Sequence, residues 1–344
     1  MGGDKPFHDG GGLCSPGRWP PGKRVLPAAL PGLRARLLGQ FEKAVRSASD
    51  GADDPLSFML KLAAGRFKNS PFGEPLLEET RAWLRDVLSM PATNDVVAAG
   101  QVFHLPLMAG ILQAYGDPDW RFVQDLSEGV SLGVDEELPR TPSVFEEKGK
   151  WRLSDDVGPG ADTTENYQSV SPHVDKVRAL FREEAALGWM VELPEAEARA
   201  VYKDRLAIAA LGVVEERDKI RVVHDGSHKV HMNHRIRVRD QIRCPGAGEI
   251  RAIIQERMDL GAKSFAILGD VSKAHRRIKV KEADWGFQAC QLDPGLVWLN
   301  KVGTFGMSPA AYYWASRQQW LFGLASTWQE RREHWSFSCT STTS

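Results

Sequence analysis

A short apolar run that ends in one aspartate places the strongest constraint on how this chain folds. Residues 265–268 read Phe-Ala-Ile-Leu, and Gly269 and Asp270 follow directly. Such a run is typical of a short, fully buried strand. An ionised carboxylate at the end of a buried strand is unfavourable unless a metal, a cation or hydrogen-bond donors face it. Asp270 therefore either caps the helix that follows or binds a hard cation such as Mg²⁺ through oxygen.

The overall composition is that of a soluble globular protein, with 42% hydrophobic and 26% charged residues in a chain of 344 that has room for two domains. A formal net charge of −1 indicates no class of partner, so only local charge clusters are informative. The cysteines include no C-x-x-C pair, which argues against a disulfide framework or a cysteine-based zinc site. The longest apolar stretch, residues 96–112, is interrupted, and the start lacks the pattern of a signal peptide. We therefore expect no membrane span and an intracellular location, in the cytoplasm or nucleus, without secretion.

The first half of the chain is expected to be mainly helical. Residues 1–32 contain eight glycines and six prolines, a composition that predicts a disordered leader. In residues 33–138, apolar side chains recur at three- and four-residue spacing, which predicts a helical extension. Residues 139–170 are mostly polar and rich in residues that break regular structure, which predicts a linker or extended arm.

Residues 171–325 combine helices and hairpins without simple alternation, which predicts an α+β fold. Ser-Pro pairs at 171–172 and 308–309 are expected to begin two of the helices. Turn residues separate each pair of strands. We expect helices at 174–187, 195–205, 248–260 and 310–322, and hairpins made by 206–216 with 219–226 and by 285–292 with 296–305. Residues 326–344 are expected to form an irregular tail.

Basic residues gather in this second half. Between residues 217 and 243, eight Lys or Arg stand against three Asp. Such a run is usually a solvated surface, but here the cations recur on a predicted strand, in the loop after it and again after Asp270. Repeated basic elements around one carboxylate favour a phosphate-lined channel. The nucleic-acid-binding candidates are Arg235, Arg237, Arg239, Lys273, Arg276 and Arg277.

Two further patterns have both a structural and a functional interpretation. Four of the nine histidines lie within residues 224–234, but their intervals match no zinc finger, so they are expected to face water or contact nucleic acid. Gly303 and Gly306 flank Phe305 and either form a turn before a helix or let a base or template strand lie against the backbone. The aromatic residues of the next helix are expected to pack in the core.

The order of these elements resembles the fingers and front palm of retroelement reverse transcriptases. The resemblance covers residues 172–325 and is carried by three segments in sequence: KIRVVHDGSH, FAILGDVSKAHRRI and KVGTFGMSPAAYYWA. It implies a partial right-hand polymerase fold behind the helical extension. It also implies an RNA-directed DNA polymerase, in which an RNA or DNA template-primer and a dNTP react with the help of two Mg²⁺ ions.

The same resemblance implies roles for the metal and phosphate ligands. Asp270 would bind both magnesium ions, and Val271 would offer its backbone carbonyl. Lys219 and Arg221 would contact the triphosphate of the incoming nucleotide, as Lys and Arg do in phosphate sites generally.

Around the nucleotide, the resemblance places His275 against the 2′ position of the sugar, where the family usually has Tyr or Phe. Phe305 and Gly306 would lie beside the nucleotide and the template. The family's remaining catalytic carboxylates come from an aromatic-x-Asp-Asp hairpin after the last helix, and residues 321–344 contain no aspartate. We therefore expect a truncated polymerase with an incomplete Mg²⁺ site that extends primers negligibly by itself.

Two other functions stay open at this point. The chain is alternatively a non-catalytic RNA- or DNA-binding module that uses the basic face of residues 217–281. It is otherwise an interaction protein whose function lies in the helices of residues 33–135. The sequence indicates no oligomeric state.

Overall fold

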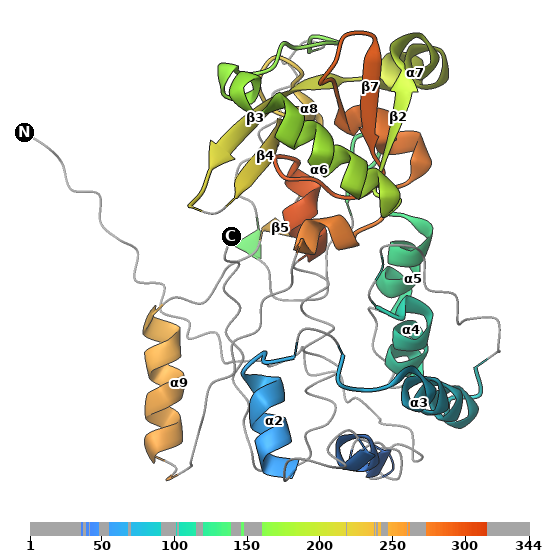
Figure 1. Cartoon of the computed structure of the whole chain (residues 1–344), viewed down its shortest axis with the longest axis vertical. Helices are drawn as coiled ribbons and strands as arrows, with labels where there is room; N and C mark the ends of the chain where they lie inside the picture. The colour runs from blue at the N-terminus through green and yellow to red at the C-terminus, as the bar shows by residue number, and fades with distance from the viewer. Residues whose placement is uncertain are drawn as a thin grey trace, which may run out of the picture.

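The computed structural model describes residues 36, 39–40, 42–47, 55–67, 70–90, 101, 103–114, 120–138, 146–147, 160–217, 219–236, 238, 240–241, 247–259, 261 and 273–314. Within these residues the chain has a mixed α+β fold with one five-stranded sheet (Figure 1). The strand expected at 265–268 lies outside the described residues, as do the expected leader and tail. The same holds for Asp270, Val271, Arg237 and Arg239.

The sheet has the strand order β2-β7-β6-β3-β4. Strand β3 pairs with β6 in parallel, and the other neighbouring pairs are antiparallel. The strands are β2 (Met190–Pro194), β3 (Ile208–Glu215), β4 (Ile220–Asp225), β6 (Ala289–Cys290) and β7 (Leu296–Asn300). Two further strands, β1 (Glu146–Glu147) and β5 (Asp240–Gln241), form a separate antiparallel pair.

Both expected hairpins are confirmed, but β1, β5 and one strand of the five-stranded sheet were not expected. Strands β3 and β4 pair from Ala210 opposite Asp225 to Glu215 opposite Ile220. Strand β6 is short because the 3₁₀ helix η5 (Glu282–Gln288) occupies the residues before it. The unexpected strand of the sheet is β2, an edge strand that contains a proline. Its conformation comes from pairing with β7, and local sequence gives little sign of it.

Helices α6 (Val174–Ala186) and α7 (Glu195–Tyr202) cover opposite faces of the sheet. Phe181 of α6 meets Trp298 of β7 edge-on, with ring centroids 5.4 Å apart. Tyr202 of α7 belongs to the cluster of buried residues that contains Leu299. Because consecutive residues of a strand point to opposite faces, the two helices pack on different sides of β7. Figure 1 shows α6 lying across the sheet and α7 beside β2.

The remaining short helices connect these elements. The Ser-Pro pair at 171–172, expected to begin a helix, lies inside η2 (Gln168–His173), and α6 begins after it. Backbone hydrogen bonds to the carbonyls of Ile208 and Leu211 hold Thr164 and Tyr167 along β3, so this part of the expected linker belongs to the folded body. The other short helices are η3 (Lys203–Arg205), η4 (Ala274–Arg277) and α8 (Met232–Arg235), and a longer helix, α9, spans Ala247–Asp259.

The N-terminal half is helical, as expected, and its last two helices share a hydrophobic core with the sheet. The helices described there include α2 (Pro55–Ala63), α3 (Glu74–Val87), α4 (Leu105–Ala114) and α5 (Trp120–Glu128). Leu112 of α4 and Leu126 of α5 are fully buried in the same core cluster as Ala209 of β3 and Phe287 of η5. The boundary expected at residue 138 is therefore not a boundary of the hydrophobic core.

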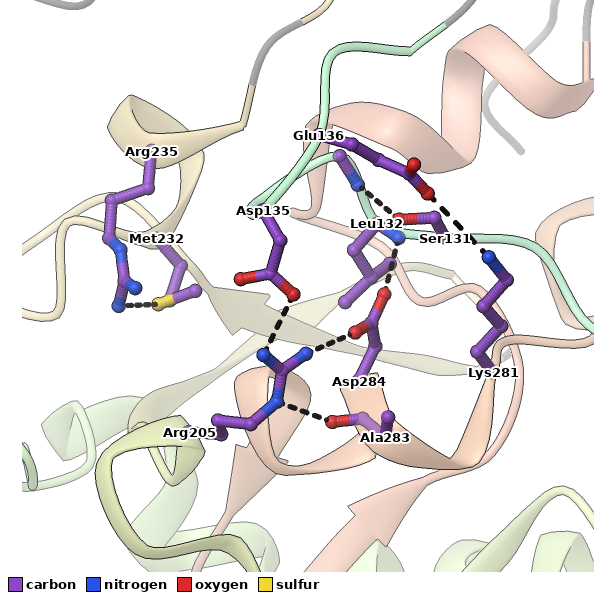
Figure 2. Close-up of polar contacts among 11 residues, drawn as sticks. Ser131, Leu132, Asp135, Glu136, Arg205, Met232, Arg235, Lys281, Ala283 and Asp284 are labelled. Carbon is purple, nitrogen blue, oxygen red and sulfur yellow. Dashed lines mark hydrogen bonds and ion pairs between the residues drawn. The ribbon is translucent and has the colours of Figure 1, made fainter.

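A polar network fastens the segment after α5 to the sheet body, as Figure 2 shows. Arg205 donates to Asp284 Oδ1 at 2.6 Å, to Asp135 Oδ2 at 2.7 Å and to the carbonyl of Ala283 at 2.9 Å. The other oxygen of Asp284 accepts the backbone N–H of Leu132 at 2.7 Å. Asp284 is buried, and its charge is matched by Arg205, so this carboxylate has a structural role.

Candidate nucleotide-binding site

Two basic side chains at the start of β4 share one carboxylate. Lys219 and Arg221 are two positions apart, so they lie on the same face of the chain. Glu216, on the other side of the hairpin turn, pairs with both. Its Oε1 lies 2.5 Å from Arg221 Nη2, and its Oε2 lies 3.5 Å from Lys219 Nζ. The two side chains expected to bind phosphate, Lys219 and Arg221, are thus brought together, and the carboxylate of Glu216 lies between them.

The loop that carries Phe305 and Gly306 lies directly against β4. The backbone N–H of His224 donates to the carbonyl of Phe305 at 3.3 Å. Gly306 has φ +93°, and a Cβ added there would lie 1.7 Å from the carbonyl oxygen of His224. Both the backbone conformation and the contact exclude a side chain, so the loop takes this position only with glycine at 306.

The side-chain amide of Asn233, in α8, holds the same loop from a second direction. Its Nδ2 donates to the carbonyl of Gly306 at 2.5 Å and to Ser227 Oγ at 2.9 Å. Its Oδ1 accepts the backbone N–H of Ser308 at 2.8 Å. An amide both donates and accepts, which this position requires. Sequence reasoning missed Asn233 because it lies among histidines and basic residues that carry a stronger chemical signal.

Phe305 is the point at which the expected nucleotide-binding residues meet. Its ring lies 5.7 Å from Cζ of Arg221, within the range of a cation–π contact. The ring of His275, in η4, meets it edge-on with centroids 4.8 Å apart. Burial lowers the pKa of His275, so this imidazole is neutral at pH 7. Two segments distant in sequence, β4 and η4, therefore contact the aromatic ring of a third.

Two further contacts fix the backbone beneath this ring. A Cβ added at Gly303 would lie 2.8 Å from the carbonyl oxygen of His275, so the loop and η4 are in close contact. His224 is buried, and its Nε2 lies 3.0 Å from the carbonyl oxygen of Ala289 in β6. Burial lowers the pKa of His224 to about 4, which keeps the ring neutral inside the sheet. The site is therefore built on a rigid part of the fold.

Arg276 was expected to contact nucleic acid, and the structure places it inside the protein. Its side chain is buried, and its Nη2 pairs with Glu184 of α6. Its Nη1 donates to Asn300 Oδ1 at 2.7 Å. A buried guanidinium with a carboxylate and an amide as partners joins η4 to α6 and β7, which differs from the exposed phosphate contact expected from the sequence.

The other cations after residue 272 also have partners within the fold. Lys273 Nζ and Arg277 Cζ lie 5.3 and 4.9 Å from the ring of Trp189. Lys279 donates to the carbonyl of Ser127, and Lys281 lies 3.6 Å from Glu136. These cations after Asp270 therefore contact other parts of the protein, which the charge pattern alone did not indicate.

Arg235 is the one described member of the three basic residues expected in the loop after β4. It is exposed at the end of α8, its guanidinium lies 5.3 Å from the ring of Phe287, and its Nη1 lies 3.8 Å from the sulfur of Met232 (Figure 2). These contacts are weak, so Arg235 keeps an exposed charge near the core. Its exposed guanidinium is accessible to a phosphate group.

The carboxylates needed for a metal site are not gathered in the described part of the chain. There, no cluster of three or more His, Cys, Asp or Glu side chains is suited to hold a metal ion. Asp284 is paired with Arg205, and Asp293 accepts from Arg178 at 2.8 Å. These two aspartates thus serve ion pairs, and the described residues alone do not fit a Mg²⁺ site.

Comparison with known proteins leaves the family of this chain unassigned. No protein-family model matches it, and no curated protein matches it. Of the helices that the structure describes, none is both long enough and apolar enough to cross a membrane.

Proposed function

We propose that this chain is the fingers and front palm of a reverse transcriptase from a retroelement, with a dNTP and an RNA or DNA template-primer as its ligands. The observation that supports this most is the convergence of Arg221, His275 and Phe305 around the loop of Gly306. The resemblance assigned each of these residues to the nucleotide separately. A random assignment would not be expected to place Arg221 and His275 against the same ring of Phe305.

In the proposed site, each group has a defined part. Lys219 and Arg221 bind the triphosphate through charge-assisted hydrogen bonds. Phe305 offers a flat apolar surface, and His275 beside it limits the space near the sugar. The loop that carries Phe305 is fixed by Gly306, so this ring is oriented before the nucleotide binds.

The proposed reaction also needs Mg²⁺, which would neutralise charge on the triphosphate and orient the attacking 3′-hydroxyl. By resemblance, the Asp270 carboxylate and the Val271 carbonyl would hold it. The described residues add no further carboxylate cluster to them. We therefore propose that this chain by itself binds nucleotide but transfers nucleotidyl groups negligibly.

A primer-extension assay together with a binding titration tests this proposal. The purified chain is expected to bind dTTP saturably, to bind it about tenfold more weakly as R221Q or F305A, and to incorporate almost no labelled dNTP. Incorporation at a rate that falls in D270N would contradict the expected inactivity. Failure to bind dTTP at all would contradict the nucleotide site.

The second candidate function is a non-catalytic RNA- or DNA-binding module on the basic face of residues 217–281. The exposed positions of Arg235 and Lys219 favour it, whereas the buried ion pair of Arg276 with Glu184 does not. Salt-dependent binding of an oligonucleotide, without binding of dTTP, would support this module and overturn the nucleotide site.

A further inference from the structure

We infer that Glu216 competes with the triphosphate of the nucleotide for Lys219 and Arg221, and so sets the nucleotide affinity of the site. This role rests on the proposed function, which assigns those two cations to the triphosphate. The carboxylate holds one cation with each oxygen, at 2.5 Å for Arg221 and 3.5 Å for Lys219. Two oxygens of a phosphate chain make the same pair of contacts when they bind two neighbouring cations.

The position of Glu216 allows the exchange. Its side chain is 29% exposed, and those of Arg221 and Lys219 are 22% and 58% exposed, so water and solutes reach all three. The longer contact, with the more exposed Lys219, is a weak ion pair that is easily broken. A triphosphate carries several negative charges, so it displaces a single carboxylate from a pair of cations when it is present at sufficient concentration.

The hairpin itself does not depend on the carboxylate. The backbone N–H of Glu216 donates to the carbonyl of Lys219 at 2.9 Å, which closes the turn through the main chain. The aromatic contact of Arg221 with Phe305 also involves no atom of Glu216. Replacement by glutamine therefore keeps the size of the side chain and the turn, and removes only the negative charge.

Adjacent Glu215 provides a matched control. Its side chain points to the other face of β3, where its Oε1 lies 2.7 Å from His173 Nε2. The variants E216Q and E215Q change the net charge of the protein by the same amount, one residue apart. A difference between them therefore reports the pairing of Glu216 with Lys219 and Arg221, and not the total charge.

The experiment is a calorimetric titration of the full chain with dTTP and with inorganic tripolyphosphate, in the wild type, E216Q, E215Q and R221Q. We expect E216Q to bind both probes about three- to tenfold more tightly than the wild type, because one unit of repulsion close to the phosphates is removed. We expect E215Q to bind like the wild type and R221Q to bind more weakly. The gain in E216Q should shrink as the salt concentration rises.

Three results would overturn the role of Glu216, and they separate it from the proposed function. If E216Q binds like the wild type while R221Q is weakened, the nucleotide site stands and Glu216 has no part in its affinity. If E215Q gains as much as E216Q, the effect is one of total charge. If neither the wild type nor E216Q binds either probe, the proposed nucleotide site fails together with the role of Glu216.

Discussion

Gly306 lies against the backbone of His224 so closely that a β-carbon at position 306 would stand 1.7 Å from the His224 carbonyl oxygen. This contact brings the loop of Phe305 onto β4, next to Arg221. The candidate site thus depends on close contact between two backbone segments, the loop of Gly306 and β4. This contact is present without a bound ligand.

Replacement of Gly306 by alanine is expected to destabilise the protein by more than about 3 kcal/mol, because it adds both backbone strain and overlap. Gly188→Ala is the matched control, since Gly188 also has a positive φ, +75°, but open space around its Cβ position. There we expect only the strain, about 1–2 kcal/mol. Urea unfolding of both variants measures the difference, and equal losses would show that the contact with His224 is not tight.

The pairing of Arg205 with Asp284 predicts unequal effects for its two carboxylate partners. Asp284 has a side chain only 6% exposed, whereas that of Asp135 is 59% exposed. We expect D284N to lower the free energy of unfolding by about 2–3 kcal/mol, because Arg205 loses a partly desolvated partner. The change D135N should cost less than about 1 kcal/mol. Chemical denaturation of both variants measures these changes. A larger loss of stability in D135N than in D284N would contradict the prediction that Asp284 is the more important partner of Arg205.

His224 predicts how stability depends on pH. Its pKa is about 4 in the folded protein, against an ordinary value of 6.5, because burial disfavours the charged ring. Between these values the unfolded chain binds a proton that the folded protein does not, so stability falls as the pH drops from 6.5 toward 4. The expected loss from this residue is about 3 kcal/mol.

The variant H224Q isolates this contribution, since glutamine has a donor for the Ala289 carbonyl but does not titrate. The pKa values of His275 and His104 are also lowered, mainly by burial, and both residues titrate in the wild type and the variant alike. We expect the stability of H224Q to vary less with pH across this window. Parallel pH profiles of the two proteins would show that His224 is not the residue responsible.

The amide of Asn233 predicts that aspartate is not an adequate substitute. In N233D one oxygen still accepts from Ser308, but the other faces the carbonyl of Gly306, where a donor is needed. We expect a loss of about 2 kcal/mol in stability and weaker binding of dTTP, because the loop shifts. The variant S227A removes only the hydroxyl contact and should cost less than about 1 kcal/mol. Equal losses of stability in N233D and S227A would show that the contact with Gly306 has no special role.

Local patterns were sufficient to predict the hairpins and most helices of this fold. The two apolar runs that form β3 and β4 are joined by a short polar turn, and the structure pairs them as expected. The segments 285–292 and 296–305, separated by a turn, were predicted to pair in the same way, and the structure pairs β6 with β7 within them. These elements were predictable because neighbours in sequence determine them.

Contacts between distant segments were not predictable from one sequence. Leu112 and Leu126 were placed in a separate extension, although they belong to the same buried cluster as residues of the sheet, because apolar periodicity does not say which core a helix joins. Arg276 was expected to be exposed. Its partner, Glu184, lies on a helix far away in sequence, so the local sequence gives no sign of the pair. Asn233 carried no charge or motif that would have singled it out.

Photoaffinity labelling with a radiolabelled photoreactive dTTP analogue is the most direct test of the proposed nucleotide site. Tryptic cleavage after Lys301 gives a peptide that contains Phe305 and Gly306. We expect the label to fall on this peptide or on the one that begins at Ile220, to be blocked by unlabelled dTTP, and to be lost in R221Q. Label on other peptides, or label that unlabelled dTTP does not block, would contradict the proposal that these residues bind a nucleotide.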